Sequence, residues 1–125
     1  MIVRHSEDMH AAFVVLFSKG DLDGLINLYE RDAILIPQPG QSPVKGHNAI
    51  RAVLKEFLAL HAKLTMRTDS VIKTADVALL RSTWTLAVPG PEGKTADMTH
   101  RALEVVRPQS DGGWRFVIDH PFGGD

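Results

Sequence analysis

Apolar and polar positions divide the chain into a helical half and a β half. In the first half, apolar residues recur at helical spacing in three segments, which predict helices over residues 6–20, 21–29 and 48–58. A short apolar run at residues 33–37 (AILIP) predicts a buried strand between the second and third helices, and residues 61–73 alternate well enough for another. The first half is therefore mainly helical.

The second half has the pattern of three long strands. Residues 77–88, 94–107 and 114–122 are joined by PGPEG and PQSDGG, two turn sequences rich in Gly, Pro and Asp. Apolar residues occur at both parities in these strands, as in Leu79 beside Leu80, so we expect both faces of the sheet to be covered. Helices followed by strands predict an α+β fold, with helices on one face of an antiparallel sheet and a second subunit on the other.

Composition narrows the classes of partner. The 14 Lys and Arg residues balance 15 Asp and Glu residues without a long run of either sign, so neither nucleic acid nor an anionic membrane is an expected partner. The absence of Cys excludes disulfides and thiolate metal sites and fits a reducing compartment. The first ten residues, MIVRHSEDMH, carry acids where a signal peptide needs an apolar segment. We expect one cytoplasmic domain over residues 1–125.

Four segments together resemble a known superfamily. GDLDGLINLYERDAILIPQPG, VKGHNAIRAVLKEF, LLRSTWTL and RALEVVRPQSDGGWRFVIDHPFG resemble the SnoaL-like and ketosteroid-isomerase-like proteins of the nuclear transport factor 2-like superfamily. The resemblance implies a cystatin-like, cone-shaped α+β barrel, in which three N-terminal helices pack on a curved antiparallel sheet around a cavity. It also implies a homodimer through the outer sheet face. The same scaffold serves isomerases, cyclases, dehydratases and noncatalytic assembly modules, so the fold alone assigns no activity.

The catalytic residues of the steroid isomerase are not found in this chain. Alignment on GDLDG places the isomerase's oxyanion-hole tyrosine at Phe13, its catalytic aspartate at Pro37 and its second oxyanion-hole acid near Ala102. A phenyl ring donates no hydrogen bond, and neither proline nor alanine can move a proton. By this alignment, the chain does not isomerise steroids by that mechanism.

Closing the two hairpins at their turns predicts which side chains share a face. One face then groups polar residues among apolar ones, namely Leu79, Arg81, Thr83, Met98, His100, Glu104, Ile118, His120 and Phe122. By resemblance this is the concave face. We expect His100 and His120 to be acid or base residues there, with Glu104 as their partner and Arg81 as an anion clamp.

The predicted ligand-binding residues are Arg81, Thr83, Tyr29, Phe13, Met98, Ile118 and Phe122. In the alternative interpretation, Arg81 and Glu104 form a structural bridge across the strands, and backbone or water satisfies the histidines. A register one residue different would place Arg81, His100, Glu104 and His120 on the other face, at the dimer interface.

The predicted dimer interface contains Trp84, Leu86, Leu103 and Val105, with pocket lining as the alternative for Trp84. We expect Trp114 to be a structural plug after the DGG turn. The hydroxyl of Tyr29 either donates into the cavity or is satisfied in the core. Asp119 has the outer parity and is expected to make a structural hydrogen bond.

The sequence favours no metal and no cofactor. Its six histidines lack the usual ligand spacings, and only His100, Glu104 and His120 form a weak candidate group. Two functions are open. One is a lyase or isomerase that acts on a small apolar compound by proton transfer, with His100 or His120 as base. The other is a noncatalytic ligand-binding or dimeric assembly module.

Overall fold

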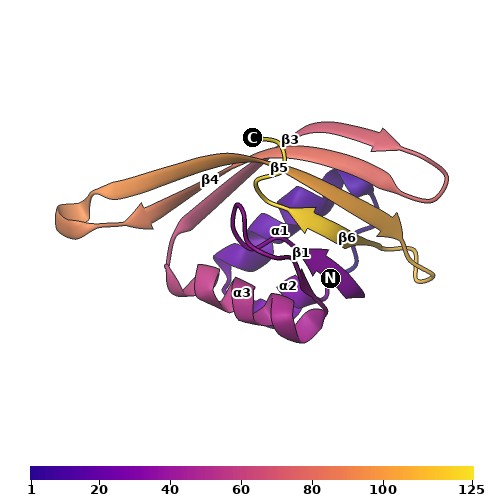
Figure 1. Cartoon of the computed structure of the whole chain (residues 1–125), viewed down its shortest axis with the longest axis horizontal. Helices are drawn as coiled ribbons and strands as arrows, with labels where there is room; N and C mark the ends of the chain where they lie inside the picture. The colour runs from indigo at the N-terminus through magenta and orange to yellow at the C-terminus, as the bar shows by residue number, and fades with distance from the viewer.

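A computed structural model describes all residues from 1 to 125. Three helices lie on one side of a curved six-stranded sheet that does not close into a complete barrel (Figure 1). The elements are η1 (Ser6–Asp8), α1 (Met9–Ser18), α2 (Leu22–Ile26), β1 (Tyr29–Leu35), β2 (Val44–Lys45), α3 (His47–Ala59), β3 (Lys63–Lys73), β4 (Ala78–Pro89), η2 (Pro91–Gly93), β5 (Thr95–Pro108) and β6 (Trp114–His120). The predicted α+β class is confirmed.

The strands follow the order β2-β1-β6-β5-β4-β3 across the sheet. The neighbours from β6 to β3 are antiparallel, whereas β1 pairs with β6 in parallel. The sequence did not predict this parallel pair or the two-residue strand β2. The β4–β5 hairpin extends beyond the helices at one end of the molecule (Figure 1). No helix has the length and apolar character needed to cross a membrane.

The corner between α1 and α2 forms for local reasons. Gly20 follows α1 with a φ of 67°, a left-handed conformation that favours glycine. Asp21 then caps α2, because its Oδ1 accepts a hydrogen bond from the backbone N–H of Gly24 at 2.9 Å. The predicted second helix was too long. Tyr29 already belongs to β1, where it lies opposite Phe116 of β6.

The predicted register of the β4–β5 hairpin was wrong by one residue. Arg81 lies opposite Leu103, and Glu104 lies opposite Leu80. The cause is the turn, which holds an odd number of residues between the last pair, Pro89 and Thr95, and includes the short helix η2. Because side chains alternate along a strand, this difference exchanges the two faces of β4 relative to the prediction.

A β-bulge changes the register of the next hairpin. Near the turn, Val106 lies opposite Phe116, as the prediction required. The register then shifts between Val105 and Val106, so that Glu104 lies opposite Asp119 instead of Ile118. The bulge therefore turns Asp119 toward the helices and Ile118 away from them.

The concave face of the sheet forms the core with the helices. Its buried side chains on β4 and β5 are Ala78, Leu80, Ser82, Trp84, Leu86, Ala102, Glu104 and Val106. Tyr29 and Phe116 pack at the centre with their rings 5.1 Å apart, and both are almost fully buried. On the outer face, Leu79 and Ile118 each remain 38% exposed.

Candidate functional site

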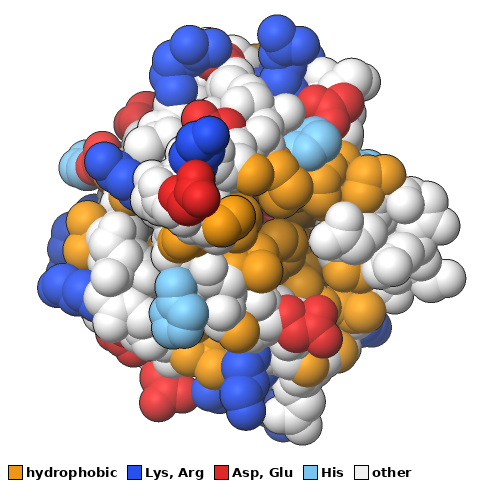
Figure 2. Space-filling model, turned by 90° about the vertical axis from the view of Figure 1, so that its left-hand side faces the viewer, with side chains coloured by type: hydrophobic (Ala, Val, Ile, Leu, Met, Phe, Trp, Pro, Cys, Tyr) orange, Lys and Arg blue, Asp and Glu red, His pale blue; other side chains and the backbone are white.

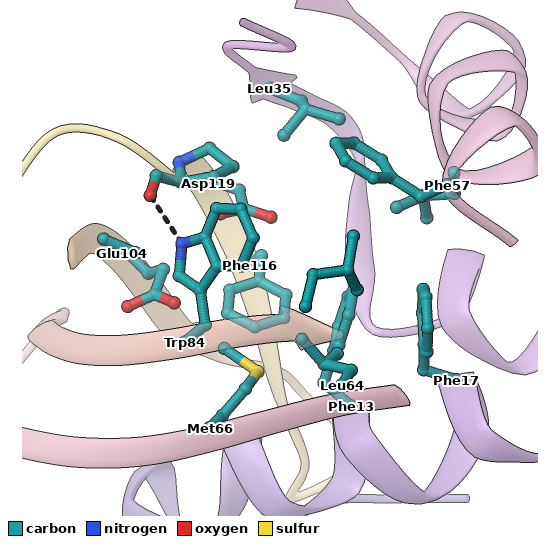
Figure 3. Close-up of a pocket in the computed structure, with 14 residues that line it drawn as sticks. Phe13, Phe17, Leu35, Phe57, Leu64, Met66, Trp84, Glu104, Phe116 and Asp119 are labelled. Atoms are coloured by element: carbon teal, nitrogen blue, oxygen red, sulfur yellow. Dashed lines mark hydrogen bonds between the residues drawn. The ribbon is translucent and has the colours of Figure 1, made fainter. Parts of the chain in front are cut away.

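A pocket of about 70 Å³ lies between the concave face of the sheet and helices α1 and α3. It is lined by 14 residues, of which 11 are hydrophobic: Phe13, Phe17, Leu35, Leu54, Phe57, Leu64, Met66, Trp84, Leu86, Ala102, Glu104, Phe116, Asp119 and Pro121. Aromatic rings from both helices and from the sheet face one another across it (Figure 3). Seen from the hairpin end, hydrophobic side chains gather in a hollow at the centre of the molecule (Figure 2).

Two carboxylates are the ionisable groups that line this pocket. Glu104 of β5 and Asp119 of β6 are cross-strand partners, so their side chains leave the sheet on the same face. Both are nearly buried, with 2% and 8% of their surface exposed. Both carboxylates point into the space beside Trp84 (Figure 3). A pair of acids in an apolar pocket is a setting in which protons can be shared.

Each carboxylate is held by different groups. The hydroxyl of Tyr29 donates to Oδ2 of Asp119 at 2.5 Å. The hydroxyl of Ser82 donates to Oε2 of Glu104 at 3.1 Å, and Nε2 of His10 lies 2.9 Å from the same oxygen. Behind Glu104, the other ring nitrogen of His10 shares a hydrogen bond of 2.6 Å with the hydroxyl of Thr68. The network thus extends from the pocket through α1 to β3.

The environment raises the pKa of Asp119 from its ordinary 3.8 to about 7. Burial is the largest cause, and the neighbouring charge of Glu104 acts in the same direction. The hydrogen bond from Tyr29 and the charge of His10 oppose these effects. Burial and the charge of Asp119 also raise the pKa of Tyr29 well above 10.0, so the phenol keeps its proton. Asp119 therefore exchanges its proton near neutral pH, whereas Tyr29 remains a donor.

Residues 121–125, here called the C-terminal strap, lie at the edge of the pocket and contribute one residue to its lining. Pro121 lines the pocket, and its carbonyl accepts a hydrogen bond from Nε1 of Trp84 at 2.7 Å. The ring of Phe122 lies 5.7 Å from Trp84 and 4.9 Å from His100. Asp125 secures the strap to β5, since one oxygen pairs with Nδ1 of His100 at 2.7 Å. This hydrogen bond lowers the pKa of Asp125.

Comparison with known families identifies the domain. A family model for the SnoaL-like domain matches residues 10–117. The chain belongs to the SnoaL-like domain family. No curated protein sequence matches it. Solved structures of a ketosteroid isomerase-like protein and of an NTF2-like protein with a cystatin-like fold share the fold of this domain, as the sequence resemblance implied.

Solved structures share the fold of this SnoaL-like domain at low sequence identity. A ketosteroid isomerase-like protein from Erwinia carotovora atroseptica has a TM-score of 0.76 at 19% identity, over 91% of this chain and 89% of that one. A candidate calcium/calmodulin-dependent protein kinase type II association domain from Thiobacillus denitrificans gives 0.78 at 24%, over 96% and 95%. A candidate dehydratase of the NTF2-like family from Streptomyces avermitilis gives 0.74 at 20%, over 90% and 88%.

The SnoaL-like domain does not bring the predicted polar cluster together. Arg81, Thr83 and Ile118 lie on the outer face, so their predicted place in the pocket was wrong. Arg81 is exposed and has no bridge to Glu104, which contacts His10 and Ser82 instead. The anion clamp therefore has no counterpart in the pocket.

The two predicted catalytic histidines lie outside the lining of the pocket. His100 shares a face with Trp84 but pairs with the strap, while His120 lies opposite Leu103 and packs against Gly123. No group of three or more His, Asp or Glu side chains is arranged to hold a metal ion. Of the predicted catalytic residues, Glu104 is the one that lines the pocket.

The remaining predicted residues divide between the pocket and its surroundings. Phe13 lines the pocket, Tyr29 reaches it through Asp119, Phe122 belongs to the strap, and Met98 lies on the projecting hairpin with 39% of its surface exposed. Placing Trp84 and Leu86 at the outer face was wrong, because both are buried on the concave face and line the pocket. Leu103 and Val105 do lie on the outer face, on the same side as Arg81 and Leu79.

Sequence reasoning missed Asp119 and His10. Asp119 was assigned to the outer face because the bulge in β5–β6 leaves no mark in the alternation of residues. His10 did give a signal, since it is a polar residue beside Met9 on the apolar side of the first helix. A buried histidine at that position requires a partner, and Glu104 supplies it.

Proposed function

We propose that this SnoaL-like domain is a small-molecule lyase or isomerase in which Asp119 transfers a proton to or from an apolar substrate. The observation that carries the proposal is the Glu104–Asp119 pair in the wall of an otherwise apolar pocket. The acid form of Asp119 gives its proton to a departing hydroxyl group, which leaves as water. A carboxylate then removes a proton from the adjacent carbon, and the electron pair of that C–H bond forms the double bond.

The surrounding groups fit these roles. With a pKa of about 7, Asp119 is present in both its acid and its carboxylate form at neutral pH. Tyr29 fixes the orientation of Asp119 from behind, and His10 with Ser82 holds Glu104 as the second carboxylate. The aromatic and aliphatic walls give the two carboxylates apolar surroundings, in which electrostatic interactions are stronger than in water.

Hydrogen bonding in the pocket leaves one donor for a substrate. A hydroxyl group that leaves as water, or a substrate oxygen that gains negative charge, needs such a free donor. The indole N–H of Trp84 is bonded to Pro121, and the hydroxyls of Tyr29 and Ser82 are bonded to the carboxylates. The protonated form of Asp119 is then the donor available to a substrate. A dehydration uses such an acid to protonate the departing hydroxyl group, and the candidate dehydratase from Streptomyces avermitilis has the same fold.

The test is loss of water from a panel of small cyclic and aryl-substituted alcohols that carry a hydrogen on the carbon next to the C–OH group. NMR in D₂O follows the reaction, so that exchange of carbon-bound protons is also detected. Asp119→Asn is expected to lower the rate of any reaction found by roughly a hundredfold or more. Asp76→Asn removes an exposed carboxylate from the β3–β4 turn and should leave the rate unchanged. An active Asp119→Asn variant would refute the assignment of this residue.

A second proposal concerns the outer face of the sheet and retains the idea of a dimeric module. Four apolar side chains form one row across the strands, in the paired order Ile72, Leu79, Val105 and Ile118. Ile72 is 60% exposed, and such a row on a sheet face is typical of a protein contact. We propose that a second copy of the chain covers it. Light scattering should give a dimer for the wild type and a monomer for Ile118→Lys, while Met98→Lys on the hairpin stays dimeric.

We also propose that the protein is located in the cytoplasm. Fractionation of cells that express the chain would check it, and recovery from a membrane or from the medium would contradict it.

A further inference from the structure

With Asp119 in its carboxylate form, which prevails above about pH 7, the polar atoms that face the pocket are acceptors. Of the 14 lining residues, the three that are not hydrophobic side chains are Glu104, Asp119 and Pro121. The indole N–H of Trp84 is committed to the carbonyl of Pro121 at 2.7 Å. On Asp119, Oδ2 accepts from Tyr29, while Oδ1 has no hydrogen-bond partner in the protein. A ligand in this pocket therefore meets a carboxylate oxygen that is still able to accept a hydrogen bond.

No positive side chain lines the pocket to balance these acids. None of the lining residues is Lys, Arg or His. His10 contacts Glu104 from the helix side, and Arg81 lies on the opposite face of the sheet. An anionic ligand would bring a further negative charge beside two nearly buried carboxylates, and His10, the basic side chain next to them, already contacts Glu104 from outside the pocket. Juxtaposing like charges in a buried site is strongly unfavourable.

The rest of the pocket suits a single ring. Phe13, Phe57, Phe116 and Trp84 present their rings around the space in front of the acids (Figure 3). Aromatic faces attract cations as well as other rings, so they favour a ligand that carries a positive charge next to an apolar body. The volume of about 70 Å³ limits the enclosed part of the ligand to a small group.

We propose that the pocket selects its ligand by the charge and hydrogen-bonding character of its head group. It takes a single-ring apolar compound whose head group is a hydrogen-bond donor, a hydroxyl or a protonated amine, placed at Oδ1 of Asp119. It rejects the carboxylate of the same shape. The inference uses the same pocket as the proposed function but requires no reaction. A protein that shows this binding preference but dehydrates none of the alcohols that carry a hydrogen on the adjacent carbon would contradict the proposed function alone.

The experiment compares three probes of nearly equal shape: benzyl alcohol, benzylamine and benzoate. Affinities are measured at about pH 7.5 by NMR titration, in which shifts at pocket residues separate binding there from binding elsewhere. Benzyl alcohol and benzylamine should each bind at least roughly tenfold more tightly than benzoate. If benzylamine binds more tightly than benzyl alcohol, charge is the main source of selection. If the two affinities are equal, the hydrogen bond is the main source.

Variants assign the selectivity to the acids. Asp119→Asn keeps the shape and an acceptor for Tyr29 but removes the charge, so the preference for benzylamine over benzoate should fall by roughly tenfold. Glu104→Gln should also reduce the preference for benzylamine over benzoate. It serves as the second test if circular dichroism shows that Asp119→Asn has altered the fold. Asp76→Asn should preserve the wild-type preference. Benzoate binding as tight as that of the amine, no binding of any probe, or unchanged selectivity in both acid variants would overturn the inference.

Discussion

Replacing Asp119 by Asn should remove a pH dependence from the stability of the protein. The folded protein holds the pKa of this carboxyl at about 7, compared with an ordinary value of 3.8. Between these values the folded protein binds a proton that the unfolded chain has released, so the free energy of unfolding falls as the pH rises. Above about pH 7 the destabilisation is fully present.

The pKa difference sets the magnitude. At about 1.4 kcal/mol for each pH unit, a change from 3.8 to about 7 corresponds to a destabilisation of about 4 kcal/mol. About 3 kcal/mol of this falls between pH 5 and pH 8. Asparagine cannot ionise, and its side-chain oxygen still accepts the hydrogen bond from Tyr29. The stability of Asp119→Asn relative to wild type should therefore increase by about 3 kcal/mol from pH 5 to pH 8.

Urea unfolding, followed by tryptophan fluorescence at several pH values, gives the free energies directly. Other groups titrate in both proteins, so the difference between wild type and variant isolates Asp119. Asp76→Asn, at an exposed turn, provides the control for loss of one surface carboxylate. A difference between Asp119→Asn and wild type that stays constant within about 0.5 kcal/mol over this range would refute the reasoning.

Three further changes test other parts of the structure. Tyr29→Phe removes a hydrogen bond that lowers the pKa of Asp119, so the ionisation of Asp119, read from a pH–rate profile or by NMR, should move to higher pH; an unchanged midpoint would exclude this role. Gly24→Ala should destabilise the fold by about 1–3 kcal/mol in urea unfolding, because the new Cβ would lie 2.8 Å from Cδ2 of the buried Leu16. Wild-type stability would contradict this close approach. Asp125→Asn weakens the attachment of the strap, so ligand release should be faster than in the wild type at neutral pH. The two rates should converge as the pH falls, because protonation of Asp125, whose pKa is lowered, removes the same charge from the wild type. Stopped-flow fluorescence would measure the release.

The order of elements followed from the sequence because each signal is local. Residue spacing predicted the helices, and turn residues delimited the long strands. The end of the second helix was different, because Leu28 and Tyr29 continue a helical spacing that pairing with β6 overrides. That contact lies far away along the chain. No local pattern indicates it.

The candidate site was only partly predictable because it depends on register. The prediction placed Glu104 in the pocket correctly but placed Arg81 there as well. The reason is that the number of residues in a turn rich in Gly and Pro, which sets the register, is not evident from its composition. A difference of one residue moved Trp84 from the expected dimer interface to the pocket wall. The bulge then brought Asp119 beside Glu104. Both events are single-residue changes in backbone geometry with large effects on which side chains meet.

The strap helps to shape the binding chamber although it lies outside the sheet. Residues 121–125 come after the last strand of the sheet, yet they supply Pro121 to the chamber and cover Trp84 with Phe122. Exchanges in this short tract would reshape the chamber while the strands keep their pairing. Exchanges at Pro121 and Phe122 are therefore expected to change which molecules the chamber accepts.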